Sequence, residues 1–239
     1  MATSIGLKYL QLAEKEPEGI EMIRKAVAYL EDSYDEERKG WFSVTKEVNE
    51  YAHAPWWTFD ENTKMSMIDS NWGNPSSELI GYLYRYKKYL KKLNIDELVG
   101  HAIYHYNHVT EYESEHEIYC YIRLYNQLNK KDRKRIKGQL DHAVDKLMNP
   151  DMEQWIKYVP MPLNFFEADS EDFFGIHIND FNNNLNYFVK ELEDKGHILP
   201  VWTWGEFPDE WEEAKNQWTG VLTLEAMIKL KRFDRISYK

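Results

Sequence analysis

Residues 74–93 decide the fold class; they read NPSSELIGYLYRYKKYLKKL. Asn74 suits the position that caps a helix and Pro75 suits its first turn, so this dipeptide predicts a helix start. Apolar side chains then recur every three or four residues, at Leu79, Leu83, Tyr86, Leu90 and Leu93. This spacing places them on one face, so we predict a single amphipathic helix over 74–93.

The same spacing continues on both sides of this helix. Seven more helices are predicted, over 4–15, 18–32, 95–110, 114–129, 131–148, 180–194 and most of 209–233. Short links between consecutive helices favour antiparallel hairpins. No long segment alternates as a strand does, and only Trp202-Thr203-Trp204 is a candidate for a short extended piece. We predict an all-α fold in a single domain over 1–239.

The composition is that of a folded, acidic protein. The 239 residues are 43% hydrophobic and 30% charged, which excludes wholesale disorder. Lys and Arg total 30 against 41 Asp and Glu, so the net charge is −11. Without a basic stripe, such a chain is not expected to bind nucleic acid.

The chain has one cysteine and no pattern typical of export. A single thiol excludes an internal disulfide and a cysteine-rich zinc site. Cys120 stands between two tyrosines in a predicted helix, so we expect it to be packed rather than reactive. The N-terminal residues show no secretory signal, and no apolar run approaches the ~20 residues of a membrane helix. We expect a cytoplasmic protein without a membrane span.

Aromatic residues make up 15% of the chain, and many fall in three long connections, 33–73, 149–179 and 195–208. Connections of this length are often functional in compact domains. Their aromatic side chains either form satellite hydrophobic clusters or line a pocket. The second interpretation assigns ligand binding to four indoles: Trp56, Trp57, Trp202 and Trp204. We expect these indoles to meet around the largest pocket.

Polar residues in the first long connection are candidates for catalysis. His53, Asp60 and Asp69 all lie there, among its aromatic residues. Carboxylates between aromatic walls suit acid–base work on a glycoside, and a single acid would suit protonation of an alkene. A surface or capping role is the competing interpretation for each of them.

One face of the helix predicted over 74–93 is both polar and aromatic. Glu78 lies one turn from its start and is a further catalytic candidate, although a favourable position near a helix N-terminus also explains it. Tyr82 and Arg85 continue this face and are predicted to bind the ligand. We expect the face to complete the wall of the proposed site.

Three histidines form a stripe on the helix predicted over 95–110. His101, His105 and His108 are spaced so that they share a face. They are interpreted as a solvated face, as the polar wall of a cavity, or as metal ligands. Because they span nearly two turns, a single ion would not reach all three comfortably. We therefore predict no metal site and no cofactor.

Two stretches of the chain resemble small bacterial proteins of the terpenoid cyclase and protein prenyltransferase superfamily. The first is the segment 74–81 with Arg85-Tyr86. The second runs over 199–205, continues over 218–226 and ends in Arg235-Ile236. The resemblance implies an α/α toroid, complete or incomplete, whose long loops close a central aromatic cavity.

The chain departs from this superfamily in its catalytic motifs. It lacks the Asp-x-Asp-Asp acid motif of the class II cyclases, and its one cysteine has no zinc-ligand pattern around it. No catalytic residue is therefore carried over. Three functions stay open: an enzyme acting on an apolar, isoprenoid-like ligand, a carbohydrate-active α/α-barrel enzyme, and a non-catalytic ligand-binding protein.

Overall fold

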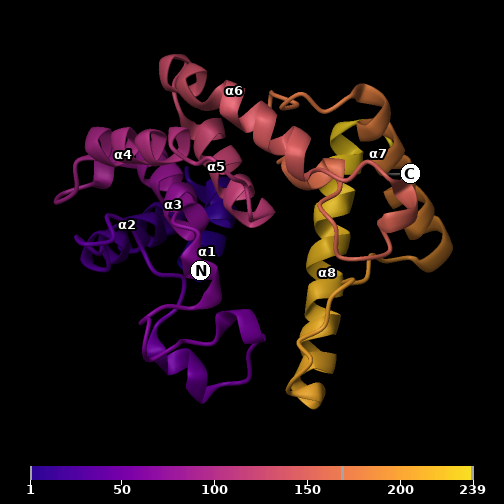
Figure 1. Ribbon diagram of the computed structural model, residues 1–239, viewed down its shortest axis with the longest axis horizontal. Coiled ribbons are helices and arrows are strands. Elements are labelled where there is room, and N and C mark those ends of the chain that lie inside the picture. Colours follow the sequence, from indigo (N-terminus) through magenta and orange to yellow (C-terminus); the bar gives the residue numbers. More distant parts are fainter. Residues whose placement is uncertain (1, 168–169, 238–239) are drawn as a thin grey trace. The chain divides into compact units, whose positions relative to one another are not determined.

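The computed structural model describes residues 2–167 and 170–237. Within them the chain forms eight α-helices (Figure 1): α1 (Ala2–Leu10), α2 (Pro17–Asp32), α3 (Gly73–Arg85), α4 (Ile95–Asn107), α5 (Glu115–Gln127), α6 (Lys130–Leu147), α7 (Ile178–Lys195) and α8 (Pro208–Arg232). Short 3₁₀ turns occupy the connections, and these residues hold no strand beyond two isolated bridges. The all-α fold is confirmed, whereas its closure into a toroid stays a prediction.

The chain divides into two compact units. Unit 1 contains the residues up to Lys46 together with Phe59–Leu140, and therefore α1 to α5 and most of α6. Unit 2 contains Glu47–Thr58 and the residues from Asp141 onward, and therefore α7 and α8. The first long connection thus contributes to both units. The single domain expected over 1–239 stays a prediction.

The predicted helix over 74–93 is too long. The α-helix ends at Arg85, and Lys87–Tyr89 forms a separate 3₁₀ turn. Beyond it, the Glu31 carboxylate of α2 accepts hydrogen bonds from the three successive backbone amides of residues 91–93, at 2.6 to 3.0 Å. These N–H groups therefore donate hydrogen bonds to the Glu31 side chain, about 60 positions earlier in the sequence, instead of to the carbonyl groups of a continuing helix. The other predicted helices lie within a few residues of their expected bounds, except that α1 ends at Leu10 and a 3₁₀ turn follows it.

Helix α3 is the centre of unit 1. It packs most extensively on α5 and also contacts α4 and α1. Ile80 and Leu83 of α3 are fully buried, as is Leu124 of α5. At Gly81 an added Cβ would lie 3.1 Å from the Leu124 Cα, so the two helices approach very closely. This close packing fixes the position of α3 against α5.

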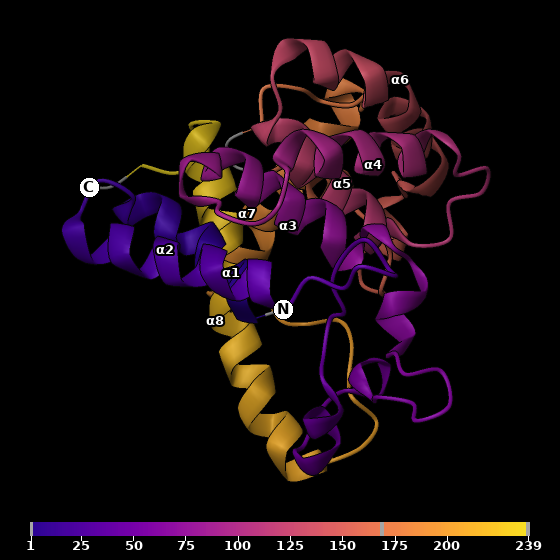
Figure 2. The same ribbon diagram turned by 90° about the vertical axis from the view of Figure 1, so that its left-hand side faces the viewer.

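Unit 2 is built on α7 and α8, which pack against each other (Figures 1 and 2). Four phenylalanine rings form its aromatic cluster, with centroids 4.9 to 6.4 Å apart: Phe166, Phe173, Phe181 and Phe233. The second long connection supplies two of these rings, so part of its aromatic content packs as a hydrophobic cluster. Among the described residues, no helix is long and apolar enough to cross a membrane.

Candidate functional site

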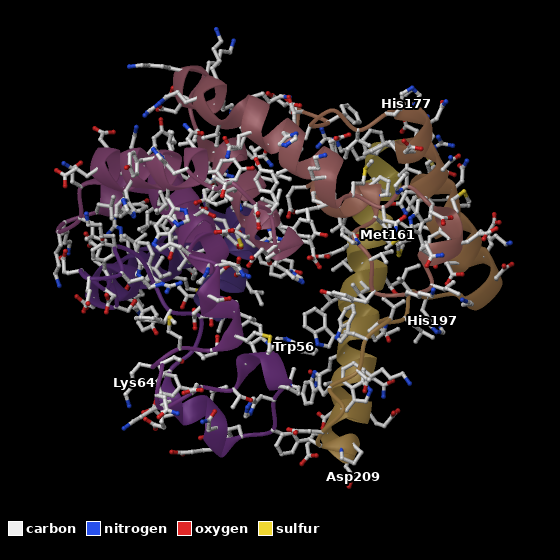
Figure 3. All side chains as sticks on the ribbon, in the orientation of Figure 1. Trp56, Lys64, Met161, His177, His197 and Asp209 are labelled. Carbon is white, nitrogen blue, oxygen red and sulfur yellow. The ribbon has the colours of Figure 1, made fainter. Side chains whose placement is uncertain are left out.

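The predicted ligand-binding indoles all lie in unit 2. Figure 3 labels Trp56, which with Trp57 belongs to a 3₁₀ turn in the first long connection. The rings of His53 and Phe207, 6.0 Å apart, bring this connection to the third one. Trp202 and Trp204 lie in that third connection, so the two pairs of indoles share a unit. Their role in binding a ligand stays a prediction.

The indoles of the third connection pack on nearby aromatic rings. Trp202 meets Trp218 of α8 edge-to-face at 5.5 Å and Tyr158 at 6.0 Å. Trp204 lies 5.5 Å from Trp211, also of α8. Trp202 and Trp204 therefore each pack on aromatic rings of their own unit.

Asp69 is a buried structural centre. Its side chain is 2% exposed and accepts hydrogen bonds from the backbone and hydroxyl of both Ser43 and Ser66, at 2.7 to 3.0 Å. It also completes a capping box with Ser66 at the start of a 3₁₀ turn. With its oxygens occupied in this way, Asp69 ties two segments of the first connection together.

Asp60 and His53 also serve local structure. The Asp60 carboxylate accepts hydrogen bonds from the backbone amides of Asn62 and Thr63 in an exposed turn, and these bonds lower its pKa. Both ring nitrogens of His53 are engaged, one with the Tyr51 carbonyl at 2.6 Å and the other with a threonine hydroxyl at 3.1 Å. Asp60 belongs to unit 1 and His53 to unit 2.

Glu78 is buried at the contact of three helices. Arg123 of α5 donates a hydrogen bond to its Oε2 at 2.7 Å, and the Ser4 hydroxyl of α1 donates to its Oε1. The Cys120 thiol lies 3.5 Å from Oε2. Burial, reinforced by the Glu78 charge, raises the pKa of this thiol well above its usual value. Cys120 is therefore protonated and packed, and Glu78 joins α1, α3 and α5.

The remaining predicted residues of α3 differ in exposure. Tyr82 is 4% exposed and belongs to the core of unit 1. Arg85, at the end of the helix, lines a pocket of about 340 Å³, which we call the Arg85 pocket. This pocket has seven lining residues: Glu14, Lys15, Ile23, Arg85, Tyr86, Lys88 and Tyr89. All of them belong to unit 1, so one compact unit builds the whole site.

A carboxylate and a guanidinium meet in two parallel hydrogen bonds inside the Arg85 pocket. Arg85 Nε and Nη2 each donate to one oxygen of Glu14, both at 2.9 Å, and the Tyr86 hydroxyl donates to the same carboxylate at 3.3 Å. The hydrogen bond from Arg85 lowers the pKa of Glu14, and the same hydrogen bond raises the pKa of Arg85. Burial raises the pKa of Tyr86 to about 12. All three groups therefore keep their usual charge states at neutral pH.

Two lysines give the Arg85 pocket an excess of positive charge. Neither Lys15 nor Lys88 is ion-paired with any residue in the described part of the chain. The Lys88 ammonium lies 4.9 Å from the centre of the Tyr89 ring, and the guanidinium of Arg24 lies 5.2 Å from the same ring. Three cationic side chains thus line the pocket against one carboxylate, in a chain whose net charge is −11.

One stretch of the sequence indicates this pocket, although we expected no basic stripe. Residues 85–92 read RYKKYLKK, with five basic side chains interleaved with aromatic and aliphatic ones. Such a run is also common where a helix ends, because cations complement its C-terminal dipole. The contribution of Glu14 and Lys15 was not visible, because only the fold brings the turn after α1 to the end of α3.

The histidine stripe divides into two parts. His101 and His105 both pack on Trp72, with ring centroids 5.0 and 4.7 Å away. His105 Nδ1 is also 3.0 Å from the Tyr121 hydroxyl, whereas His108 Nδ1 faces the backbone carbonyl of Tyr104 at 2.7 Å. Burial lowers the pKa of His101 and His105, so both imidazoles are neutral at pH 7. No group of three potential metal ligands occurs among the described residues.

A second pocket, of about 400 Å³, lies between α1 and α2. Its lining is largely apolar and includes Leu7, Leu10, Met22 and Tyr29, with Lys25 as its one charged residue. Lys25 is paired with Glu21 at 3.4 Å on the exposed face of α2. This groove offers apolar contact but little that would orient a ligand.

Comparison of the chain with protein families, with curated proteins and with solved structures gave no match. The resemblance to the terpenoid cyclase and prenyltransferase superfamily therefore stays a prediction, and the functional argument rests on the Arg85 pocket itself.

Proposed function

We propose that this protein binds a small organic anion in the Arg85 pocket. The observation that carries the proposal is the concentration of Lys15, Arg85 and Lys88 around one concave site of an acidic chain. Electrostatic focusing in such a site attracts an anion even when the protein as a whole is negative. Of the three functions that the sequence left open, this is the non-catalytic binding protein.

The lining also defines the rest of the ligand. Tyr86 and Ile23 are buried and contribute apolar surface to the pocket. The Tyr89 ring is half-exposed and lies beside the cationic groups of Arg24 and Lys88. An aromatic group on the ligand can pack on Tyr89 while its anionic group meets the ammonium and guanidinium groups. A volume of about 340 Å³ accommodates a ligand of the size of a substituted benzene ring with one anionic group.

Binding rather than catalysis fits the residues that line the pocket. None of the seven is a histidine, cysteine, serine or threonine, and the one carboxylate is held by Arg85 and Tyr86. A general base needs a free lone pair beside the reacting group, and a nucleophile needs such a base. The catalytic candidates Asp60, Asp69, His53 and Glu78 all lie outside this lining.

The earlier hypothesis of an apolar, isoprenoid-like ligand is a second candidate function. The apolar groove between α1 and α2 favours it, because its lining is mostly aliphatic and its volume is about 400 Å³. A bound hydrocarbon there would be released by Gly6→Phe, which fills the groove from α1, where an added Cβ meets no neighbouring atom within 4 Å. Retention of a fluorescent acyl probe by this variant would exclude the groove.

Titration calorimetry with phenyl phosphate tests the first proposal. We expect Lys15→Gln/Lys88→Gln to weaken binding about tenfold, because each lost charge contact contributes on the order of 0.7 kcal/mol at a partly exposed site. The matched control is Lys64→Gln/Lys134→Gln, which removes two exposed charges elsewhere. Equal affinity of the two double variants would contradict the proposal, since only bulk charge would then matter.

A further inference from the structure

We propose that Glu14 is a built-in competitor of the ligand in the Arg85 pocket, and that the ligand class it selects for is a phosphate monoester. This inference rests on the proposed function. Glu14 belongs to the turn between the 3₁₀ segment Gln11–Ala13 and α2, so it reaches the pocket from a different part of unit 1 than Arg85 does.

The Arg85 guanidinium has all three nitrogens engaged. Nε and Nη2 bond to the two oxygens of Glu14, and Nη1 donates to Gln127 Oε1 at 3.2 Å. An incoming anion can reach the paired face of the guanidinium only by replacing Glu14, because that face is the one complementary to a carboxylate or phosphate. The Glu14 carboxylate is thus positioned where the anionic group of a ligand would bind.

The side chains of this ion pair are accessible enough to exchange. Arg85 and Glu14 are 32% and 29% exposed, so water can solvate a displaced carboxylate. Pairs of this exposure are held by modest free energies. Lys15 is next to Glu14 in the turn, and Lys88 lies three residues after Arg85. Both lysines line the pocket and can contact the anionic group that replaces Glu14.

The competition favours a dianion. Glu14 carries one negative charge, and a ligand carboxylate would exchange it for an equal charge with no electrostatic gain. A phosphate monoester carries about −1.5 to −2 at neutral pH and has three acceptor oxygens, so it can bond to Arg85 and to both lysines together. We therefore expect phenyl phosphate to bind more tightly than benzoate. Its affinity should weaken as pH falls below about 6, the second pKa of a phosphate monoester, because the dianion is then protonated.

The test compares Glu14→Gln with Glu16→Gln, because each removes one negative charge from the same turn and Glu16 is exposed outside the pocket. Phenyl phosphate affinity is measured by calorimetry, and circular dichroism checks that each variant is folded. We expect Glu14→Gln to tighten binding about five- to tenfold and Glu16→Gln to change it by less than about twofold. In the unaltered protein, carbon-13 NMR of the Glu14 carboxyl should show its pKa rising toward the usual value when phenyl phosphate is bound.

The outcomes separate this inference from the proposed function. The role of Glu14 as a competitor is overturned if Glu14→Gln binds phenyl phosphate no more tightly than Glu16→Gln and the pKa of Glu14 in the unaltered protein does not change on binding. The proposed binding function then still stands, provided that the unaltered protein binds phenyl phosphate. If only Glu14→Gln binds, the competitor is supported and the binding function of the unaltered protein is overturned. If benzoate and phenyl phosphate bind equally, the selectivity for a dianion is overturned. If nothing binds to any variant, both proposals are overturned.

Discussion

Asp69→Asn should destabilise unit 1, because this carboxylate holds two segments of the first long connection together. The substitution keeps the shape of the side chain but exchanges one acceptor oxygen for an N–H₂ donor. Asp69 is 2% exposed and accepts the backbone amide of Ser43 on one oxygen and that of Ser66 on the other. Whichever way the new amide points, one of these two buried N–H groups faces another donor.

The magnitude follows from that mismatch. A buried donor left unsatisfied costs about 1–3 kcal/mol, and the remaining hydrogen bonds lose the strengthening that a charged acceptor supplies. We expect a total loss of about 2–4 kcal/mol in the free energy of unfolding, which is a large effect for one residue. The matched control is Glu61→Gln, an exposed side chain of the same connection, for which we expect less than about 0.5 kcal/mol.

Urea unfolding followed by far-UV circular dichroism measures the global effect. Hydrogen exchange at the Ser43 amide gives the local one, because this amide donates to Asp69 at 2.7 Å. A loss of stability no greater than that of the control, with unchanged protection of the Ser43 amide, would refute the assignment of Asp69 as a structural centre.

Three further predictions concern unit 1. Burial raises the pKa of Glu117, so ionising this carboxyl costs the folded state more than the unfolded state, and its own contribution to the free energy of unfolding should fall as pH rises above about 4.5; urea titrations at several pH values should show that Glu117→Gln lacks this contribution, and an identical pH dependence of the two proteins would contradict the assignment. His101 and His105 should titrate below 6.5 in NMR spectra, because burial favours the neutral imidazole; values above 6.5 would show that Trp72 does not shield them. Gly73→Ala should lower the melting temperature, because its Cβ would lie 2.4 Å from the Tyr121 ring; an unchanged melting temperature would mean that the ring moves freely.

The helices were predictable because their signals are local. Spacing of apolar residues located α2 and α4 to α8 within a few positions, and Asn74-Pro75 correctly marked the start of the regular part of α3, since Asn74 itself has extended backbone geometry (φ −105°, ψ 107°). The end of α3 was wrong because Glu31, in a distant helix, binds the amides of 91–93. Such a contact leaves no periodic trace in the sequence.

The candidate site was only half predictable. Arg85 could be selected from its position on a polar helix face, and the basic run over 85–92 was available to support it. Glu14 and Lys15 could not be selected, because they are two charged residues in an ordinary turn until α1 and α2 fold back on α3. For Asp69 and Glu78 the catalytic roles stay predictions; what the sequence did not reveal is that both carboxylates accept hydrogen bonds that join segments far apart in the chain.

The most direct measurement of the central claim is a titration of the nitrogen-15-labelled protein with phenyl phosphate, followed by amide chemical shifts. Binding in the Arg85 pocket predicts saturable shifts at Lys15, Tyr86, Lys88 and Tyr89, which all line it. The same titration of Lys15→Gln/Lys88→Gln should need about ten times more ligand to reach half saturation. Shifts confined to other parts of the chain, or none at concentrations of several millimolar, would contradict the claim that this pocket binds an organic anion.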